Sequence, residues 1–164
     1  MGRGSWWYSG EIDLGYSGAL RSAATVVVDD PIFGLFAYGG DLSREKNLTH
    51  VIPKDGLRAR FHIVRGTQRV HLLLARDGFA KDKPVSFDDE LRTIRFTLEN
   101  RAATSHETIV RAVGLLAGVY KVTAQNHPAE RLTIHDGAEQ QIRIPVDASG
   151  ASVVITRVAA STPN

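Results

Sequence analysis

The sequence predicts a mainly β protein, an antiparallel β-sandwich or jelly-roll with a short aromatic, glycine-rich segment at its N-terminus. Apolar and polar residues alternate with a period of two, turn signals separate the alternating segments, and about eight such segments follow one another. In residues 57–64, apolar side chains at positions 59, 61 and 63 alternate with Arg58, Arg60 and His62. A period of two with one polar face is typical of antiparallel sheets, and this number of strands suits a sandwich.

The first region, residues 1–40, is rich in aromatic residues and glycine. It holds seven of the 12 aromatic residues, including both tryptophans, whereas 13 of the 15 arginines follow residue 40. This shift predicts a boundary near residues 39–41 and a second region over residues 41–164. Residues 17–28 fit a helix that begins at a Ser17 cap, although the β-branched residues at its end favour a strand. Pro31 ends this element in either case.

The second region reads as a succession of strands bounded by Gly, Pro, Asn and Asp. For residues 107–116 the alternative is a helix, since Ser105 begins an imperfect capping box before them. We favour a strand there, because the residues that follow fit a turn into another strand. The acidic stretch 81–90 is predicted as a solvated loop, with a calcium site at a sandwich rim as the alternative. The predicted strands are residues 57–64, 69–75, 93–99, 107–115, 119–125, 131–135, 140–146 and 152–158.

Composition limits the classes of function. The 164 residues, of 17.9 kDa, suit one domain, and a formal net charge of +2 is too small to indicate nucleic-acid binding. The chain has no cysteine, which excludes disulfides, thiol catalysis and thiolate metal sites. No apolar run approaches the ~20 residues of a membrane helix, and the first residues lack the apolar core of a secretory signal. We therefore expect no nucleic-acid partner, no membrane partner and no cofactor.

Residues 10–40, GEIDLGYSGALRSAATVVVDDPIFGLFAYGG, resemble the end of the catalytic region in a family of large, poorly characterised microbial proteins. Those proteins are similar in plan to the six-hairpin (α/α toroid) glycosidases, with a β-sandwich after the toroid. The second region, with its late run QQIRIPVDASGASVVITRV, resembles that trailing sandwich. The resemblance implies that this chain is a C-terminal part of a larger, secreted or periplasmic protein with a carbohydrate connection.

Glu11 and Asp13 form a candidate catalytic pair in the aromatic first region. Glycoside hydrolysis needs two carboxyl groups that flank the sugar, and aromatic rings that exclude water can raise a carboxyl pKa. We give Glu11 the acid role and Asp13 the base role; the alternative is a solvated or capping pair, with the aromatic residues as core. Asp30, before Pro31, is either a turn residue or a sugar contact. The predicted substrate-binding residues are Trp6, Trp7, Tyr8, Tyr16 and Asp30.

Three further patterns carry alternatives. Residues 15–19 resemble a nucleophile elbow around Ser17, although Ala19 stands where the pattern needs glycine. The six histidines lack local metal-ligand spacing, but His62 and His71 fall on adjacent predicted strands and can pair across them. The arginine-rich residues 58–76 lack the interleaved aromatic residues that stack on single-stranded nucleic acid. We therefore predict a solvated sheet face there, or one that a partner domain covers.

The sequence thus predicts a carbohydrate-active, glycoside-hydrolase-like fragment that acts on or binds a poly- or oligosaccharide. The alternatives are a non-catalytic sugar-binding or structural sandwich module and a small esterase-type hydrolase that uses Ser17. The second region has no tryptophan and one tyrosine, so an aromatic sugar platform would have to come from the first region. Because exposed apolar patches mark interfaces, we also expect a homo-oligomer that associates through Trp6, Trp7, Phe33 and Phe36.

Overall fold

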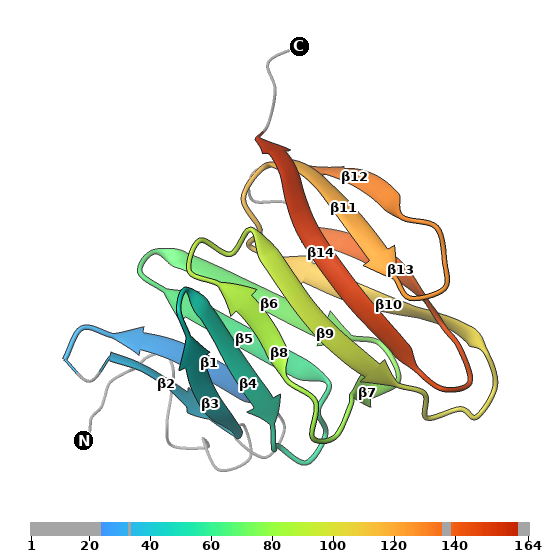
Figure 1. The fold of residues 1–164 in the computed structure, drawn as a ribbon, viewed down its shortest axis with the longest axis horizontal. Coiled ribbons are helices and arrows are strands. Elements are labelled where there is room, and N and C mark those ends of the chain that lie inside the picture. Colours follow the sequence, from blue (N-terminus) through green and yellow to red (C-terminus); the bar gives the residue numbers. More distant parts are fainter. Residues whose placement is uncertain (1–23, 33, 136–138, 161–164) are drawn as a thin grey trace.

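The structure, a computed structural model, describes residues 24–32, 34–135 and 139–160. These residues form two β-sheets that stack as a sandwich (Figure 1), which confirms the predicted fold class. The six-stranded sheet has the order β13 (Glu139–Val146), β10 (His106–Val113), β6 (Gln68–Leu74), β5 (Arg60–Arg65), β1 (Thr25–Asp30) and β2 (Gly34–Tyr38).

The second sheet has eight strands, and its main path has the order β12 (Glu130–Ile134), β11 (Gly118–Ala124), β14 (Ala151–Ala160), β9 (Thr93–Glu99), β8 (Val85–Asp88), β4 (Leu48–Pro53) and β3 (Gly40–Glu45). The short β7 (Gly78–Phe79) pairs with β9 beside this path. All described pairs are antiparallel except β1 with β5, which is parallel.

All eight strands predicted in the second region are present, with small shifts at their ends. Residues 106–113 are strand β10, so the helical alternative is not realised there. Residues 25–28, where helix and strand propensities compete, belong to β1. The β-branched side chains decide this segment, because alternate residues Thr25 and Val27 are buried against the other sheet.

The prediction that the acidic stretch 81–90 is a loop throughout is wrong: residues 85–88 of this stretch form strand β8. Val85 and Phe87 are each 1% exposed, whereas Ser86 and Asp88 between and after them are half-buried. The alternation covers only four residues, so the flanking charges conceal it in the sequence. Strands β3 and β4 lie in residues 40–53, where no strand was predicted.

The predicted boundary near residues 39–41 falls where the chain passes from one sheet to the other. Strand β2 ends the six-stranded sheet at Tyr38, and β3 begins the edge of the eight-stranded sheet at Gly40. A Cβ atom on Gly40 would lie 2.9 Å from the Ile52 carbonyl oxygen and 3.0 Å from a Thr25 methyl carbon. Glycine is therefore required here by close packing of the two sheets.

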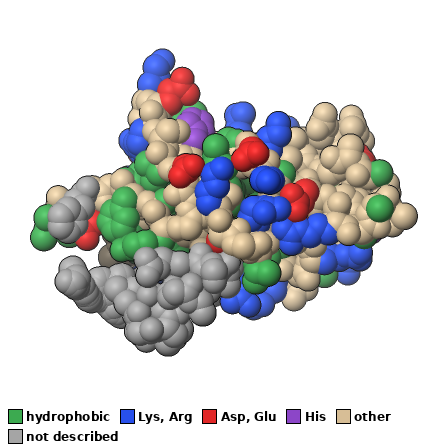
Figure 2. Space-filling view, turned by 90° about the horizontal axis from the view of Figure 1, so that it is seen from below, with side chains coloured by type: hydrophobic (Ala, Val, Ile, Leu, Met, Phe, Trp, Pro, Cys, Tyr) green, Lys and Arg blue, Asp and Glu red, His purple; other side chains and the backbone are tan. Residues whose placement is uncertain are grey.

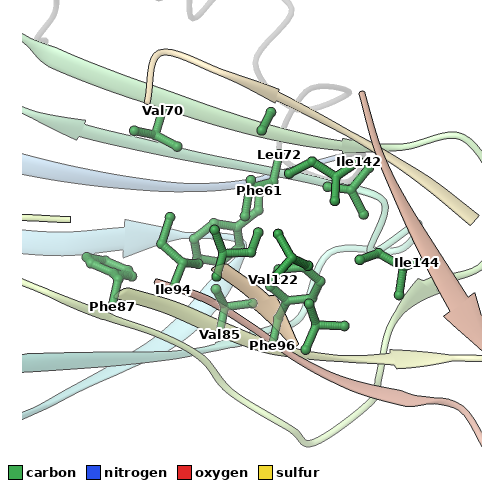
Figure 3. Packing of buried hydrophobic residues seen from close by; sticks show 14 of the residues in the cluster. Phe61, Val70, Leu72, Val85, Phe87, Ile94, Phe96, Val122, Ile142 and Ile144 are labelled. Carbon is green, nitrogen blue, oxygen red and sulfur yellow. The ribbon is translucent and has the colours of Figure 1, made fainter. Parts of the chain in front are cut away.

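The core lies between the sheets and contains aromatic and aliphatic side chains of both (Figure 3). Phe61 of the six-stranded sheet packs edge to face against Phe79 and Phe87 of the other sheet, with ring centres 6.0 and 6.4 Å apart. Phe79 in turn packs against Phe96 at 5.6 Å. These rings are the four phenylalanines of the second region, and together with the buried Tyr120 they are used for packing rather than for a surface platform.

Candidate functional site

Most of the predicted site residues lie outside the part of the chain that the structure describes: Trp6, Trp7, Tyr8, Glu11, Asp13 and Tyr16, together with Ser17 and Phe33. Asp30 is described, at the end of β1. Its Oδ1 accepts the backbone N–H of Ile32 at 2.7 Å, which closes the turn before β2. Asp30 is therefore a turn residue, as one of its two predicted roles requires, and its contact with a sugar stays a prediction.

A cavity of about 230 Å³ lies where strand β13, at the edge of its sheet, approaches β11 and the turn into β12. Strands β12 and β13 are the terminal strands of their sheets on this side (Figure 1). The wall of the cavity is formed partly by the interior of the sandwich, which supplies apolar groups, and partly by the open sheet edge, which supplies charged groups. The lining residues are Glu107, Val122, Ala124, His127, Pro128, Glu130, Arg143, Ile144 and Pro145.

Buried aliphatic side chains form one part of this cavity. Val122 and Ile144 are 5% and 0% exposed, and Ile144 lies at the margin of the packed core in Figure 3. Pro128 and Pro145 add rigid apolar surface. A ligand in this cavity would therefore contact an apolar wall that is fixed by the sandwich.

The charged lining residues are unpaired. Within the described ranges, Glu107, Glu130 and Arg143 make no ion pair or side-chain hydrogen bond. His127 is held in place instead, because its Nε2 lies 2.9 Å from Oδ1 of Asp147. The cavity thus presents two free carboxylates, one free guanidinium and one oriented imidazole to a ligand.

Sequence reasoning missed this cavity, because its polar residues are spread over β10, β13, the turn between β11 and β12, and the start of β12. No local spacing links Glu107 to Glu130 or Arg143. His127 and Pro128 were read only as a turn. The pairing of β10 with β13, which places Ile109 opposite Arg143 and Glu107 opposite Pro145, brings Glu107 near Arg143. His127 and Glu130 belong to the other sheet and its β11–β12 turn, and they meet this pair only where the two sheets come together.

A second polar cluster is built around Asp77, whose side chain is fully buried. The carboxylate accepts hydrogen bonds from the Thr108 hydroxyl, from the Arg101 N–H at 3.0 Å and from His106 Nε2 at 2.5 Å. Burial alone would raise the pKa of Asp77, but these three donors outweigh it and hold the pKa below its usual value. Every oxygen is engaged by neighbouring protein groups, so this cluster is structural.

The predicted pairing of His62 with His71 is confirmed. The two residues are opposite each other in the β5–β6 register, and their Nδ1 atoms are 2.8 Å apart. One Nδ1 carries the shared proton and the other accepts it. Burial, with added repulsion from His71 and Arg60, lowers the pKa of His62 to about 4, and burial also lowers the pKa of His71. The pair is therefore uncharged near neutral pH.

The buried pair predicts an acid-sensitive fold. The unfolded state binds a proton at His62 near pH 6.5, whereas the folded state resists protonation down to about pH 4. Stability is therefore lost as the pH falls through this window, by about 3 kcal/mol for His62 alone. We expect the double variant His62→Leu/His71→Leu to lose less stability than the wild type between pH 7 and pH 4 in urea titrations.

The exposed His135, which directly follows β12, offers the control. His135→Gln should follow the wild-type dependence on pH, because its side chain meets water in the folded and unfolded states. If the double variant loses as much stability on acidification as the wild type, the buried pair is not the source of the acid sensitivity.

No metal site is indicated by the described positions, since no group of three or more His, Asp or Glu is placed to hold an ion. Two of the five arginines in residues 58–76 form ion pairs in the structure: Arg58 pairs with Glu99 at 2.9 Å, and Arg65 pairs with Asp89 at 2.9 Å. Figure 2 shows acidic and basic side chains close together on one face of the molecule. No helix among the described residues is long and apolar enough to cross a membrane.

Comparisons with known proteins bear on the family but not on an activity. No curated protein matches the chain, and no solved structure matches it. A family model described as DUF5695, a family of unknown function, matches residues 6–154. This match includes nearly all of the sandwich together with most of the aromatic first region. The chain therefore belongs to the DUF5695 family.

Proposed function

We propose that this chain is a saccharide-binding β-sandwich module whose cavity at the β13 edge holds a sugar unit without hydrolysing it. The observation that carries the proposal is the free charged groups around an apolar wall. A sugar ring offers the matching chemistry, because its C–H face is apolar and its hydroxyl groups both donate and accept hydrogen bonds. Hydrogen bonds to charged side chains are stronger than neutral ones.

The size of the cavity favours a small ligand. Pockets for drug-sized molecules have volumes of ~300–1,000 Å³, whereas this cavity has about 230 Å³. We therefore assign it to one sugar unit at the end of a saccharide rather than to a long polymer segment. His127, fixed by Asp147, would orient the ring, and Arg143 would donate to its hydroxyl oxygens.

We expect Arg143→Gln to weaken saccharide binding about tenfold, which is the loss of about one charge-assisted hydrogen bond. Titration calorimetry with glucose, galactose, xylose, N-acetylglucosamine and glucuronic acid would measure it. Arg131→Gln is the matched control, because Arg131 is exposed on β12 and does not line the cavity. Absence of binding by every sugar at millimolar concentration, or an equal loss in both variants, would contradict the proposal.

Hydrolysis by Glu11 and Asp13, and a relationship to six-hairpin glycosidases, remain proposals from the sequence. Release of reducing sugar from a polysaccharide, with loss in Glu11→Gln at unchanged stability, separates turnover from binding. Association of two copies through Trp6, Trp7, Phe33 and Phe36 is likewise a prediction, and light scattering at high micromolar concentration tests it. A β13-edge site that binds without turnover supports the binding module.

A further inference from the structure

A serine, a histidine and a glutamate lie together on the outer face of the eight-stranded sheet, away from the cavity. Ser86 of β8 is directly opposite His50 of β4 in the strand register. The Ser86 hydroxyl oxygen is 2.7 Å from His50 Nδ1. On the other side of the ring, His50 Nε2 is 3.6 Å from Oε1 of Glu45, at the end of β3.

The sheet fixes this arrangement. Val85 and Phe87 on either side of Ser86 are buried in the core, so Ser86 must face outward. Thr49 and Val51 are both 0% exposed and impose the same orientation on His50. Two antiparallel partners on one face have Cβ atoms about 5 Å apart, which brings hydroxyl and imidazole into hydrogen-bond contact.

The charges favour the productive tautomer. The Glu45 carboxylate beside Nε2 stabilises a proton on that nitrogen, which leaves Nδ1 free to accept from the Ser86 hydroxyl. These are the roles of base, orienting carboxylate and nucleophile in a catalytic triad, with the two ring nitrogens exchanged. The histidine side chain is 27% exposed, so a substrate can reach this face.

A cation completes the group. Arg95 of β9 is opposite Ser86 on the side away from His50, and its side chain is exposed. It has no ion-pair or hydrogen-bond partner among the side chains described. Because Arg95 is opposite Ser86, its free guanidinium is the candidate partner for the negative charge that would develop on a carbonyl oxygen attacked by Ser86.

We propose that Ser86 is a nucleophile for carboxylic esters, with His50 as general base and Arg95 as oxyanion partner. Ser86 Oγ attacks the ester carbonyl carbon while its proton passes to His50 Nδ1. The carbon–oxygen bond to the alcohol then breaks, and the alcohol leaves with that proton. Water, deprotonated by His50, attacks the acyl-serine and releases the carboxylic acid and free Ser86. The open sheet face suits esters with a short acyl group and a good leaving group.

A fluorophosphonate probe and p-nitrophenyl acetate test this inference on the full chain. We expect peptide mapping to place the probe on Ser86, Ser86→Ala to abolish labelling, and His50→Gln to slow it about 100-fold. Ser43→Ala is the matched control: Ser43 is opposite His50 on β3, and among described side chains no hydrogen bond joins the two. It should label at the wild-type rate.

Glu45 is a positioning residue, and its exposed side chain allows substitution without loss of the fold. Glu45→Gln should lower kcat for p-nitrophenyl acetate several-fold and leave KM unchanged. Ester hydrolysis that persists in Ser86→Ala, or probe that reacts equally with Ser43, would overturn the proposal. Unfolding curves of each variant show whether the variant is still folded when its esterase activity is lost. Either result leaves the proposal of sugar binding at the β13 edge untouched, because the two sites share no residue.

Discussion

Replacement of Phe61 by alanine is expected to lower the free energy of unfolding by about 3–5 kcal/mol. Phe61 is 0% exposed, and its ring contacts Phe79 and Phe87 of the opposite sheet. The substitution therefore removes apolar area and leaves a cavity between the two layers, which cannot collapse without moving a strand. Because both sheets depend on this contact, the loss is global rather than confined to β5.

Urea titration followed by circular dichroism measures the effect. Ile32→Ala is the control: Ile32 is also a large apolar residue, but it is 82% exposed in the turn between β1 and β2. Its replacement should change stability by no more than about 0.5 kcal/mol. A loss below about 1 kcal/mol in Phe61→Ala would show that the aromatic cluster does not hold the sheets together.

The sequence predicted the strands whose alternation runs over many residues. For residues 93–99 the predicted and observed limits coincide, because Ile94, Phe96 and Leu98 alternate with polar neighbours and face the core. Strand β3 was missed because most of its residues are exposed. An edge strand can be polar on both faces, so its sequence carries no period of two.

The candidate sites were less accessible to sequence reasoning than the fold. His62 and His71 were found because adjacent strands in a hairpin have a register that short turns constrain. Ser86 and His50 are also opposite each other, but β4 and β8 are not consecutive in the chain, and neither strand was predicted. Contacts of this kind depend on the order of strands in the sheet, which alternation does not determine.

The second large effect is expected for Asp77→Asn, with a loss of about 3 kcal/mol at pH 6. Asparagine is chosen because Asp77 has φ of +64°, a conformation that asparagine tolerates well. Its side-chain NH₂ group would meet donors where the carboxylate now accepts from Thr108 and His106. These bonds join the β6–β7 connection to β10, and the bond from the Arg101 N–H joins it to the β9–β10 connection. Both connections cross between the sheets.

The size of this loss should depend on pH. His106 has its other nitrogen, Nδ1, 2.7 Å from the Thr104 carbonyl oxygen, so both ring nitrogens donate when the ring is charged. The hydrogen bond to Asp77, with help from Thr104, raises the pKa of His106 above 6.5. A raised pKa in the folded state stabilises the fold below pH 6.5, and this contribution is lost as the pH rises through the folded value.

Denaturation at pH 6 and pH 9 therefore gives the decisive comparison. The difference between wild type and Asp77→Asn should be smaller at pH 9 than at pH 6, because the contribution of charged His106 is lost as the pH rises through its raised pKa. Asp147→Asn is the control, because Asp147 also pairs with a histidine, His127 at 2.9 Å, but both side chains are about one-third exposed. An exposed pair contributes at most about 1 kcal/mol. Equal losses of unfolding free energy in Asp77→Asn and Asp147→Asn would mean that burial of Asp77 does not determine the strength of its pair with His106. If the difference between wild type and Asp77→Asn instead grows as the pH rises, the charge on His106 opposes folding.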